Sequence, residues 1–103
     1  MSSEVKLSHS ASLILKSIDS GYSYGFDIME VTGLPSGTIY PALRRLERDG
    51  LISAKWESER IALAEQRPPR RYYRTTKAGR EALAVLAERY PLLEKLTPAQ
   101  KSD

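Results

Sequence analysis

Two short segments with helical spacing follow one another between Tyr24 and Gly50, and only four residues separate them. The first segment ends at Gly33 and holds Ile28, Met29 and Val31. In the second segment, apolar residues recur at intervals of four and three, at Ile39, Leu43 and Leu46. That is the spacing of one face of an α-helix. Two helices joined by a tight turn that contains glycine are typical of a helix-turn-helix.

Pro41 lies inside the second of these segments. A proline is tolerated best in the first turn of a helix, where its missing N–H has no partner to lose. Ser36 or Thr38 can supply the side-chain oxygen that caps such a helix. Because Thr38 makes Pro41 the third helical residue, we expect the helix to begin after Thr38. Ser36, Thr38 and Tyr40 then lie at an exposed, positively polarised helix end that favours anions.

Helical spacing of apolar residues also occurs near both ends of the chain. We expect a first helix from Ser8 to Ser20, which Gly21 stops, and a last helix that Thr76 caps. The last helix carries a heptad-like seam of Leu83, Leu86, Tyr90 and Leu93. We expect this seam to join two chains. Pro91 is expected to kink or end the helix, which then resumes only briefly.

Alternating residues predict two strands, over residues 51–56 and 70–75, that pair as an antiparallel hairpin. The connection over residues 57–69 contains adjacent prolines and is expected to be a loop. Its residues 61–65 either form a helical turn or extend the hairpin, and the sequence leaves both open. Trp56 and Tyr73 are aromatic residues of this hairpin, and we expect them in the core rather than in a ligand site.

A chain of 103 residues, 41% of them hydrophobic, can bury one core but not two. We therefore expect a single compact domain that is mainly α with a small two-stranded β-hairpin. Its order of elements predicts a winged helix-turn-helix plus a C-terminal dimerisation helix. Residues 1–76 are assigned to the winged helix-turn-helix DNA-binding region, and residues 77–103 to the dimerisation helix and tail.

The charge of the chain is unevenly distributed along the sequence. Between Arg44 and Arg80 there are eleven basic residues against five acidic ones, a net charge of +6, and the rest of the chain carries −3. A basic middle segment is what a surface that faces nucleic-acid phosphates requires, although a solvated face of ordinary charges has the same composition. The total of +3 conceals this asymmetry.

Several classes of protein are excluded by residues that the sequence lacks. It has no cysteine and a single histidine, His9, so we expect no disulfide, no metal site and no cofactor. Scattered carboxylates and the absence of a glycine-rich phosphate loop predict that the chain is not an enzyme. The longest apolar run, over residues 82–87, is far below the roughly 18 residues that span a membrane, and no signal-peptide pattern is visible. We expect a cytoplasmic protein with no membrane partner.

Three stretches of the sequence identify a family. They are GYSYG over residues 21–25, SGTIYPALRRLERDG over residues 36–50 and RPPRRYYRTTKAG over residues 67–79. Together they resemble the PadR-like transcriptional regulators, and the resemblance covers roughly residues 11–86. It implies a homodimeric winged-helix repressor that binds double-stranded DNA at an inverted-repeat operator. In some members a hydrophobic or aromatic small molecule releases the DNA. The short segment after Tyr90 resembles the smaller subgroup, which has one C-terminal helix.

The residues expected to contact DNA lie in two places. Hydroxyls and an aromatic ring at the start of the recognition helix can meet phosphates or base edges, and the helix continues with arginines that suit guanine. The wing adds arginines for phosphates or the minor groove. The full set is Ser36, Thr38, Tyr40, Arg44, Arg45, Arg67, Arg70 and Arg71.

Two other interpretations of these residues stay open at the level of sequence. Arg45 or Arg48 can instead pair with Glu47 or Asp49, and Arg74 and Lys77 are expected to be ordinary surface charges. The fold can also serve as a protein-interaction or small-molecule-sensing module with weak or no DNA binding.

Overall fold

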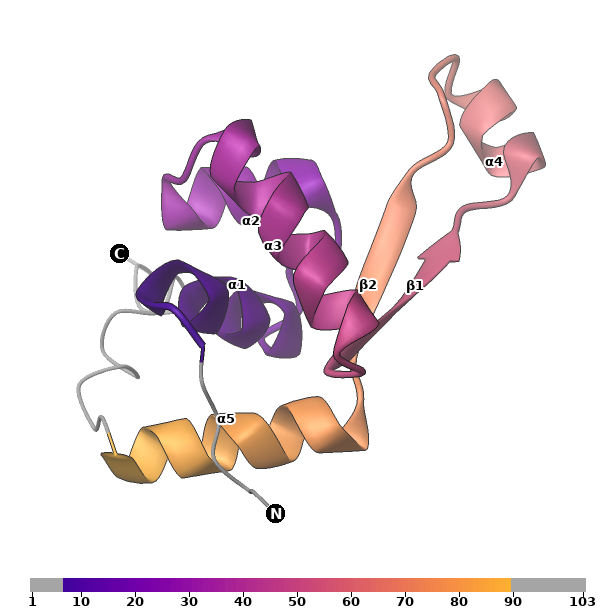
Figure 1. Cartoon of the computed structure of the whole chain (residues 1–103). Helices are drawn as coiled ribbons and strands as arrows, with labels where there is room; N and C mark the ends of the chain where they lie inside the picture. The colour runs from indigo at the N-terminus through magenta and orange to yellow at the C-terminus, as the bar shows by residue number, and fades with distance from the viewer. Residues whose placement is uncertain (1–6, 90–103) are drawn as a thin grey trace.

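The computed structural model of the chain describes residues 7–89. In this part the helices and strands follow in the order α1 (His9–Asp19), α2 (Gly25–Thr32), α3 (Ser36–Arg48), β1 (Ile52–Trp56), α4 (Glu59–Ala64), β2 (Arg71–Thr75) and α5 (Lys77–Arg89). The first three helices cluster together, the hairpin projects away from them with α4 at its tip, and α5 runs along the base (Figure 1). The expected mainly helical winged helix-turn-helix is confirmed.

The first two helices lie close to the predicted ranges, and α2 ends before Gly33 as predicted. The Ser8 hydroxyl accepts a hydrogen bond from the Ala11 N–H at 3.0 Å and so caps α1. Gly33 ends α2 in the left-handed conformation, with φ of 73°, and its N–H donates to the Met29 carbonyl. A residue with a Cβ adopts that conformation at a cost, and a glycine does not.

The third helix corrects one prediction, because it begins at Ser36 and not after Thr38. Pro35 occupies the N-cap position, and its carbonyl accepts hydrogen bonds from the N–H groups of Thr38 and Ile39 at 2.9 and 3.0 Å. Backbone and not a side chain therefore starts the helix. Pro41 lies further along α3 than we expected. Its missing N–H leaves the carbonyl of Gly37 without a helical partner, but Gly37 is exposed and water can reach it.

The two strands form the predicted antiparallel hairpin, in a register that runs from Ile52 opposite Thr75 to Trp56 opposite Arg71. Only its base reaches the core, where Ile52 and Tyr73 are buried. Tyr73 is a core residue as predicted. Trp56 is not, because the hairpin carries it beyond the helices and leaves 62% of it exposed. The connection contains a helical turn, α4, which the Ser58 hydroxyl caps by accepting from the Ile61 N–H at 3.2 Å.

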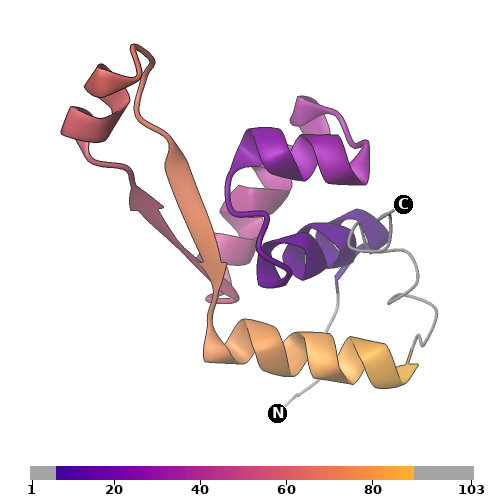
Figure 2. The ribbon, with the colours of Figure 1, turned by 180° about the vertical axis from the view of Figure 1, so that it is seen from behind.

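The last helix closes the core from below, as the view from behind shows (Figure 2). Thr76 caps α5 as predicted: its hydroxyl accepts from the Gly79 N–H at 3.0 Å and donates to the Gly50 carbonyl at 2.7 Å. Leu83 and Leu86, which we expected in a seam that joins two chains, are already buried within the single chain. Tyr90, Pro91 and Leu93 lie outside the described residues.

The core brings together side chains from every element except α4 and consists of Ile14, Leu15, Ile18, Ile28, Ile39, Leu43, Leu46, Ile52, Tyr73, Ala82 and Leu83. The buried positions of α3 have the four-and-three spacing found in the sequence, which holds one face of that helix inside and turns the opposite face to solvent. Within residues 7–89, no helix has the length and apolar character that crossing a membrane requires.

Candidate nucleic-acid interface

The solvent face of α3 carries most of the side chains that the sequence assigns to DNA. Ser36, Tyr40, Arg44 and Arg45 are exposed, and Thr38 is half-buried in the first turn. Ile39, Leu43 and Leu46 hold the opposite face in the core. Ser36, Tyr40 and Arg44, four residues apart, share one side of the exposed surface, and Arg45 lies about 100° further round the helix. A helix of this kind fits the major groove of DNA.

The arginines of α3 differ in whether a carboxylate already neutralises them. Arg48 lies 3.6 Å from the carboxylate of Asp49. Neither Arg44 nor Arg45 has a carboxylate within 4 Å among the residues that the structure describes. The open question about Arg45 and Arg48 is thus resolved in favour of a pair at Arg48. Arg44 and Arg45 keep uncompensated positive charges at the surface.

Two of the three wing arginines are engaged in ion pairs within the chain. The Arg67 guanidinium donates to both carboxylate oxygens of Glu57, at 2.7 and 2.9 Å, and the Glu57 side chain is only 7% exposed. Arg71 donates to the Glu47 carboxylate at 3.0 Å and so ties the wing to α3. Paired and partly buried charges attract phosphates less than free ones do. The structure therefore places Arg67 and Arg71 as supports of the wing.

The Glu57 carboxylate is the centre of the wing support. Hydrogen bonds from the Arg67 side chain, opposed by burial and aided by the Arg70 N–H, lower the pKa of Glu57 from 4.5 to about 2. The same pair raises the pKa of Arg67 above its usual value. Both groups therefore stay charged at neutral pH, so this ion pair between the two ends of the wing-tip segment persists there.

Arg70 is the wing arginine that stays available. Its guanidinium lies over the ring of Tyr24, 4.2 Å from the ring centroid, and no carboxylate of residues 7–89 lies within 4 Å of it. Cation–π stacking orients an arginine and leaves its outer N–H groups free to donate. Arg70 can therefore present a fixed charge beside α3.

An aromatic hollow of about 380 Å³ lies between the wing and the starts of α2 and α3. Phe26, Tyr40 and Trp56 line it and are 55%, 41% and 62% exposed. Sequence reasoning missed this feature, because Phe26 follows a glycine in a short helix with no motif and Trp56 was assigned to the core. The Tyr40 ring packs directly against Gly25, because a Cβ at that position would overlap the ring.

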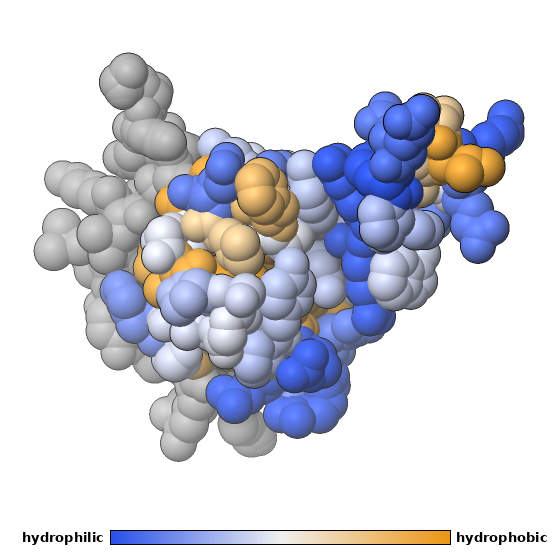
Figure 3. Space-filling view, turned by 90° about the horizontal axis from the view of Figure 1, so that it is seen from above, coloured by the Kyte–Doolittle hydropathy of each residue, from blue (hydrophilic) through white to orange (hydrophobic). Residues whose placement is uncertain are grey.

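The wing has a different surface at its tip than along its stem. Seen from above, hydrophilic surface follows the wing and is broken by an apolar patch over α4 (Figure 3). In α4, Ile61 is 51% and Leu63 77% exposed. The apolar part of the wing surface thus lies at its tip, over α4.

Comparisons with known proteins agree with this arrangement. The family model described as "Transcriptional regulator PadR-like family" matches residues 14–85, more than half of the chain. The chain belongs to this family. The resemblance that the sequence motifs indicated is therefore confirmed.

Solved structures support the membership in the PadR-like family. A PadR-like transcription factor from Bacteroides fragilis is 31% identical, with 82% of each chain covered and a TM-score of 0.67. A protein from Streptococcus mutans is 26% identical, with 87% of this chain and 85% of that chain covered and a TM-score of 0.68. A PadR family transcription regulator from Clostridium difficile is 24% identical and shares the fold, with a TM-score of 0.72 over 86% of this chain and 94% of that one. A comparison with curated proteins found no match.

Membership fixes the class of function. The PadR-like family consists of transcription regulators, so this chain is a DNA-binding regulator of transcription, and the prediction that it is not an enzyme is confirmed.

Proposed function

We propose that this PadR-like regulator is a homodimeric repressor that binds an inverted-repeat operator, with α3 in the major groove and the wing on the adjacent backbone or minor groove. The observation that carries the proposal is the pair of exposed, unpaired arginines on α3, Arg44 and Arg45, together with Arg70 of the wing, which stacks on Tyr24 and has no carboxylate partner among the described residues. These three uncompensated cations, two on α3 and one on the wing, supply the charge that phosphates and guanines attract.

The proposed roles of the site residues follow their surroundings. Arg44 shares a helix face with Tyr40 and is the proposed guanine reader, because it can donate two parallel hydrogen bonds. Ser36 and Thr38 lie in the first turn of α3, where hydroxyls and free backbone N–H groups suit a phosphate. Arg67 and Arg71 remain proposed contacts of lower importance, since Glu57 and Glu47 already neutralise them.

The proposed dimer rests on the C-terminal helix and the residues that follow it, within the division into 1–76 and 77–103. Leu83 and Leu86 face the core of their own chain. Their proposed contribution is therefore to hold α5 in place, while other residues of 77–103, including Tyr90 and Leu93, are left to contact the second chain. A two-fold dimer matches an operator with two-fold symmetry.

Binding to the DNA upstream of its own gene tests the proposal. We expect a fragment that holds an inverted repeat, with half-sites about one helical turn apart, to shift in a gel as a complex with two chains. Scrambling one half-site is the matched control and should weaken binding by at least about 100-fold, because one of the two recognition helices then meets no matching bases. A chain that shifts no inverted repeat and instead forms a stable complex with another protein would support the interaction-module alternative.

We infer that a hydrophobic or aromatic effector binds in the aromatic hollow, which lies within one chain. Trp56 is the only tryptophan, so its fluorescence reports directly on this hollow. With 2-naphthol as probe, we expect a saturable change in emission that Phe26→Ala reduces and Leu63→Ala, at the distant wing tip, does not. A linear, unsaturable change would contradict the inference.

A further inference from the structure

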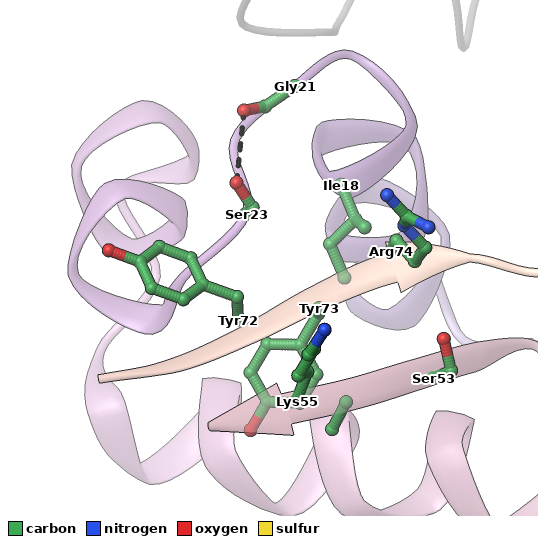
Figure 4. A pocket seen from close by; sticks show the side chains of 9 residues that line it. Ile18, Gly21, Ser23, Ser53, Lys55, Tyr72, Tyr73 and Arg74 are labelled. Atoms are coloured by element: carbon green, nitrogen blue, oxygen red, sulfur yellow. Dashed lines mark hydrogen bonds between the residues drawn. The ribbon is translucent and has the colours of Figure 1, made fainter. Parts of the chain in front are cut away.

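The hairpin has a second face that the proposed function does not use. Successive side chains of a strand point to opposite faces, so Ile52 and Tyr73 point into the core and Ser53, Lys55, Tyr72 and Arg74 point away from it. Figure 4 shows this second face, with Lys55 and Arg74 rising from neighbouring strands toward Ile18 and the turn at Gly21 and Ser23. The register makes Lys55 and Arg74 diagonal neighbours.

Two adjoining hollows lie over this face. One, of about 520 Å³, extends along the strands past Lys55 and Tyr72. The other, of about 490 Å³, reaches the start of α5 at Lys77 and Arg80. They share Ile18, Ser53 and Arg74 in their linings, so they form one depression, which we call the rear trough.

The rear trough is strongly cationic. Its lining contains four exposed basic residues, Lys55, Arg74, Lys77 and Arg80, and one acidic residue, Asp19. Among residues 7–89, no carboxylate lies within 4 Å of any of the four cations. The contrast with Arg67 and Arg71, which are both paired, is sharp. A concave surface lined by charges of one sign concentrates its field and attracts counter-charge.

The start of α5 adds to the same field. This helix of 13 residues has no acidic residue in its first turn, and it places Lys77 and Arg80 on adjacent turns of one face. The N-terminal end of a helix carries partial positive charge and is normally balanced by Asp or Glu. Arg80 is held at this end by donating to the Thr75 carbonyl at 3.2 Å. An anion bound in the trough would relieve this unfavourable order of charges.

We propose that the rear trough binds a small anion that carries two or more phosphate groups. Two guanidiniums and two ammoniums around one depression match a ligand with several negative charges, since arginine forks and lysine point charges both suit phosphate oxygens. The size of the two hollows suits a ligand of nucleotide dimensions. We expect DNA seated on α3 not to fill the trough, because α3 contacts β1 and shares the core with Ile52 and Tyr73, whereas Ser53, Lys55 and Arg74 point to the other face of the hairpin.

Calorimetric titration with inorganic triphosphate tests the proposal on the full chain. We expect saturable binding below about 1 mM at about 150 mM salt, a concentration that screens diffuse surface attraction. The double variant Arg74→Gln/Lys77→Gln should weaken this binding at least about tenfold. The matched control Arg44→Gln/Arg45→Gln removes the same charge from α3 and should leave triphosphate binding unchanged.

Binding of operator DNA in the absence of triphosphate separates the two surfaces. Arg74→Gln/Lys77→Gln should bind the operator as the unchanged chain does, while the α3 variant should not. Both substituted trough residues are exposed, and an unchanged melting temperature shows that the variant is folded. The proposal is overturned if both double variants weaken the binding of triphosphate equally, or if triphosphate shows no saturable binding. It is also overturned if the trough variant fails to bind operator DNA, because the trough would then belong to the DNA surface.

Discussion

Replacing Arg44 and Arg45 together by alanine is expected to lower the affinity for the operator by at least about 100-fold at constant salt. Each is exposed on α3 and has no carboxylate neighbour in the described part of the chain. A bidentate contact to guanine is worth about 1–3 kcal/mol of discrimination, and a phosphate contact contributes through the release of counterions. The slope of the logarithm of the affinity against the logarithm of the salt concentration should become shallower by about 1 for each phosphate that the variant no longer neutralises.

A neutral exchange in the wing provides the matched control for this result. Glu57→Gln/Arg67→Gln removes one charge of each sign, and the two side chains can still form a hydrogen bond. Since Glu57 already neutralises Arg67, we expect this variant to keep the salt slope of the unchanged chain. Anisotropy titrations of a labelled operator at three salt concentrations measure both quantities. An unchanged slope in the Arg44/Arg45 variant, or an equally large decrease of affinity in the wing variant, would place the DNA surface elsewhere.

The order of helices and strands could be predicted because local signals specify it. Apolar spacing fixed which face of α3 is buried, and Ser8, Gly33 and Thr76 begin or end their helices as caps. The start of α3 could not be predicted in this way. No side chain caps α3: Pro35 is the N-cap residue, and its carbonyl makes only backbone hydrogen bonds of the first turn, for which the sequence carries no residue-specific signal.

The state of the site arginines depends on contacts between residues that are distant in the sequence. Arg67 pairs with Glu57 and Arg71 with Glu47, across separations of 10 and 24 residues. Composition counts these residues as basic, yet their charges are already neutralised. The same limit applies to Arg74 and Lys77, which were assigned to ordinary surface charge and which lie together with Lys55 and Arg80 in the folded chain. The packing of the folded chain decides which basic residues stay unpaired. The net charge of +6 in the middle segment does not show this.

Gly79→Ala provides a test of the fold, because packing predicts that this substitution lowers stability whereas helix propensity predicts that it raises stability. It is the third residue of α5 and is buried against the start of the hairpin. A Cβ at this position would overlap the carbonyl oxygen of Leu51 and the methyl group of Thr75. The Leu51 carbonyl accepts a hydrogen bond from the Thr76 N–H at 3.1 Å, so it cannot move away without breaking that bond. The backbone at Leu51 would therefore have to shift to make room for the added methyl group, and a backbone shift costs more than moving the end of a flexible side chain.

We expect Gly79→Ala to lower the free energy of unfolding by about 2–3 kcal/mol, as overpacking does, and the melting temperature by about 10–20 °C for a domain of this size. Helix propensity alone predicts the reverse, a gain of up to about 1 kcal/mol. Gly37→Ala in α3 is the matched control: apart from its own helix backbone and chain neighbours, no atom of residues 7–89 lies within 4 Å of its added Cβ, so the stability of this variant should stay the same or rise. Chemical unfolding of both variants measures the difference. If Gly79→Ala were as stable as Gly37→Ala, the close approach of α5 to the base of the hairpin would be wrong, and with it the position of Lys77 and Arg80 at the rear trough.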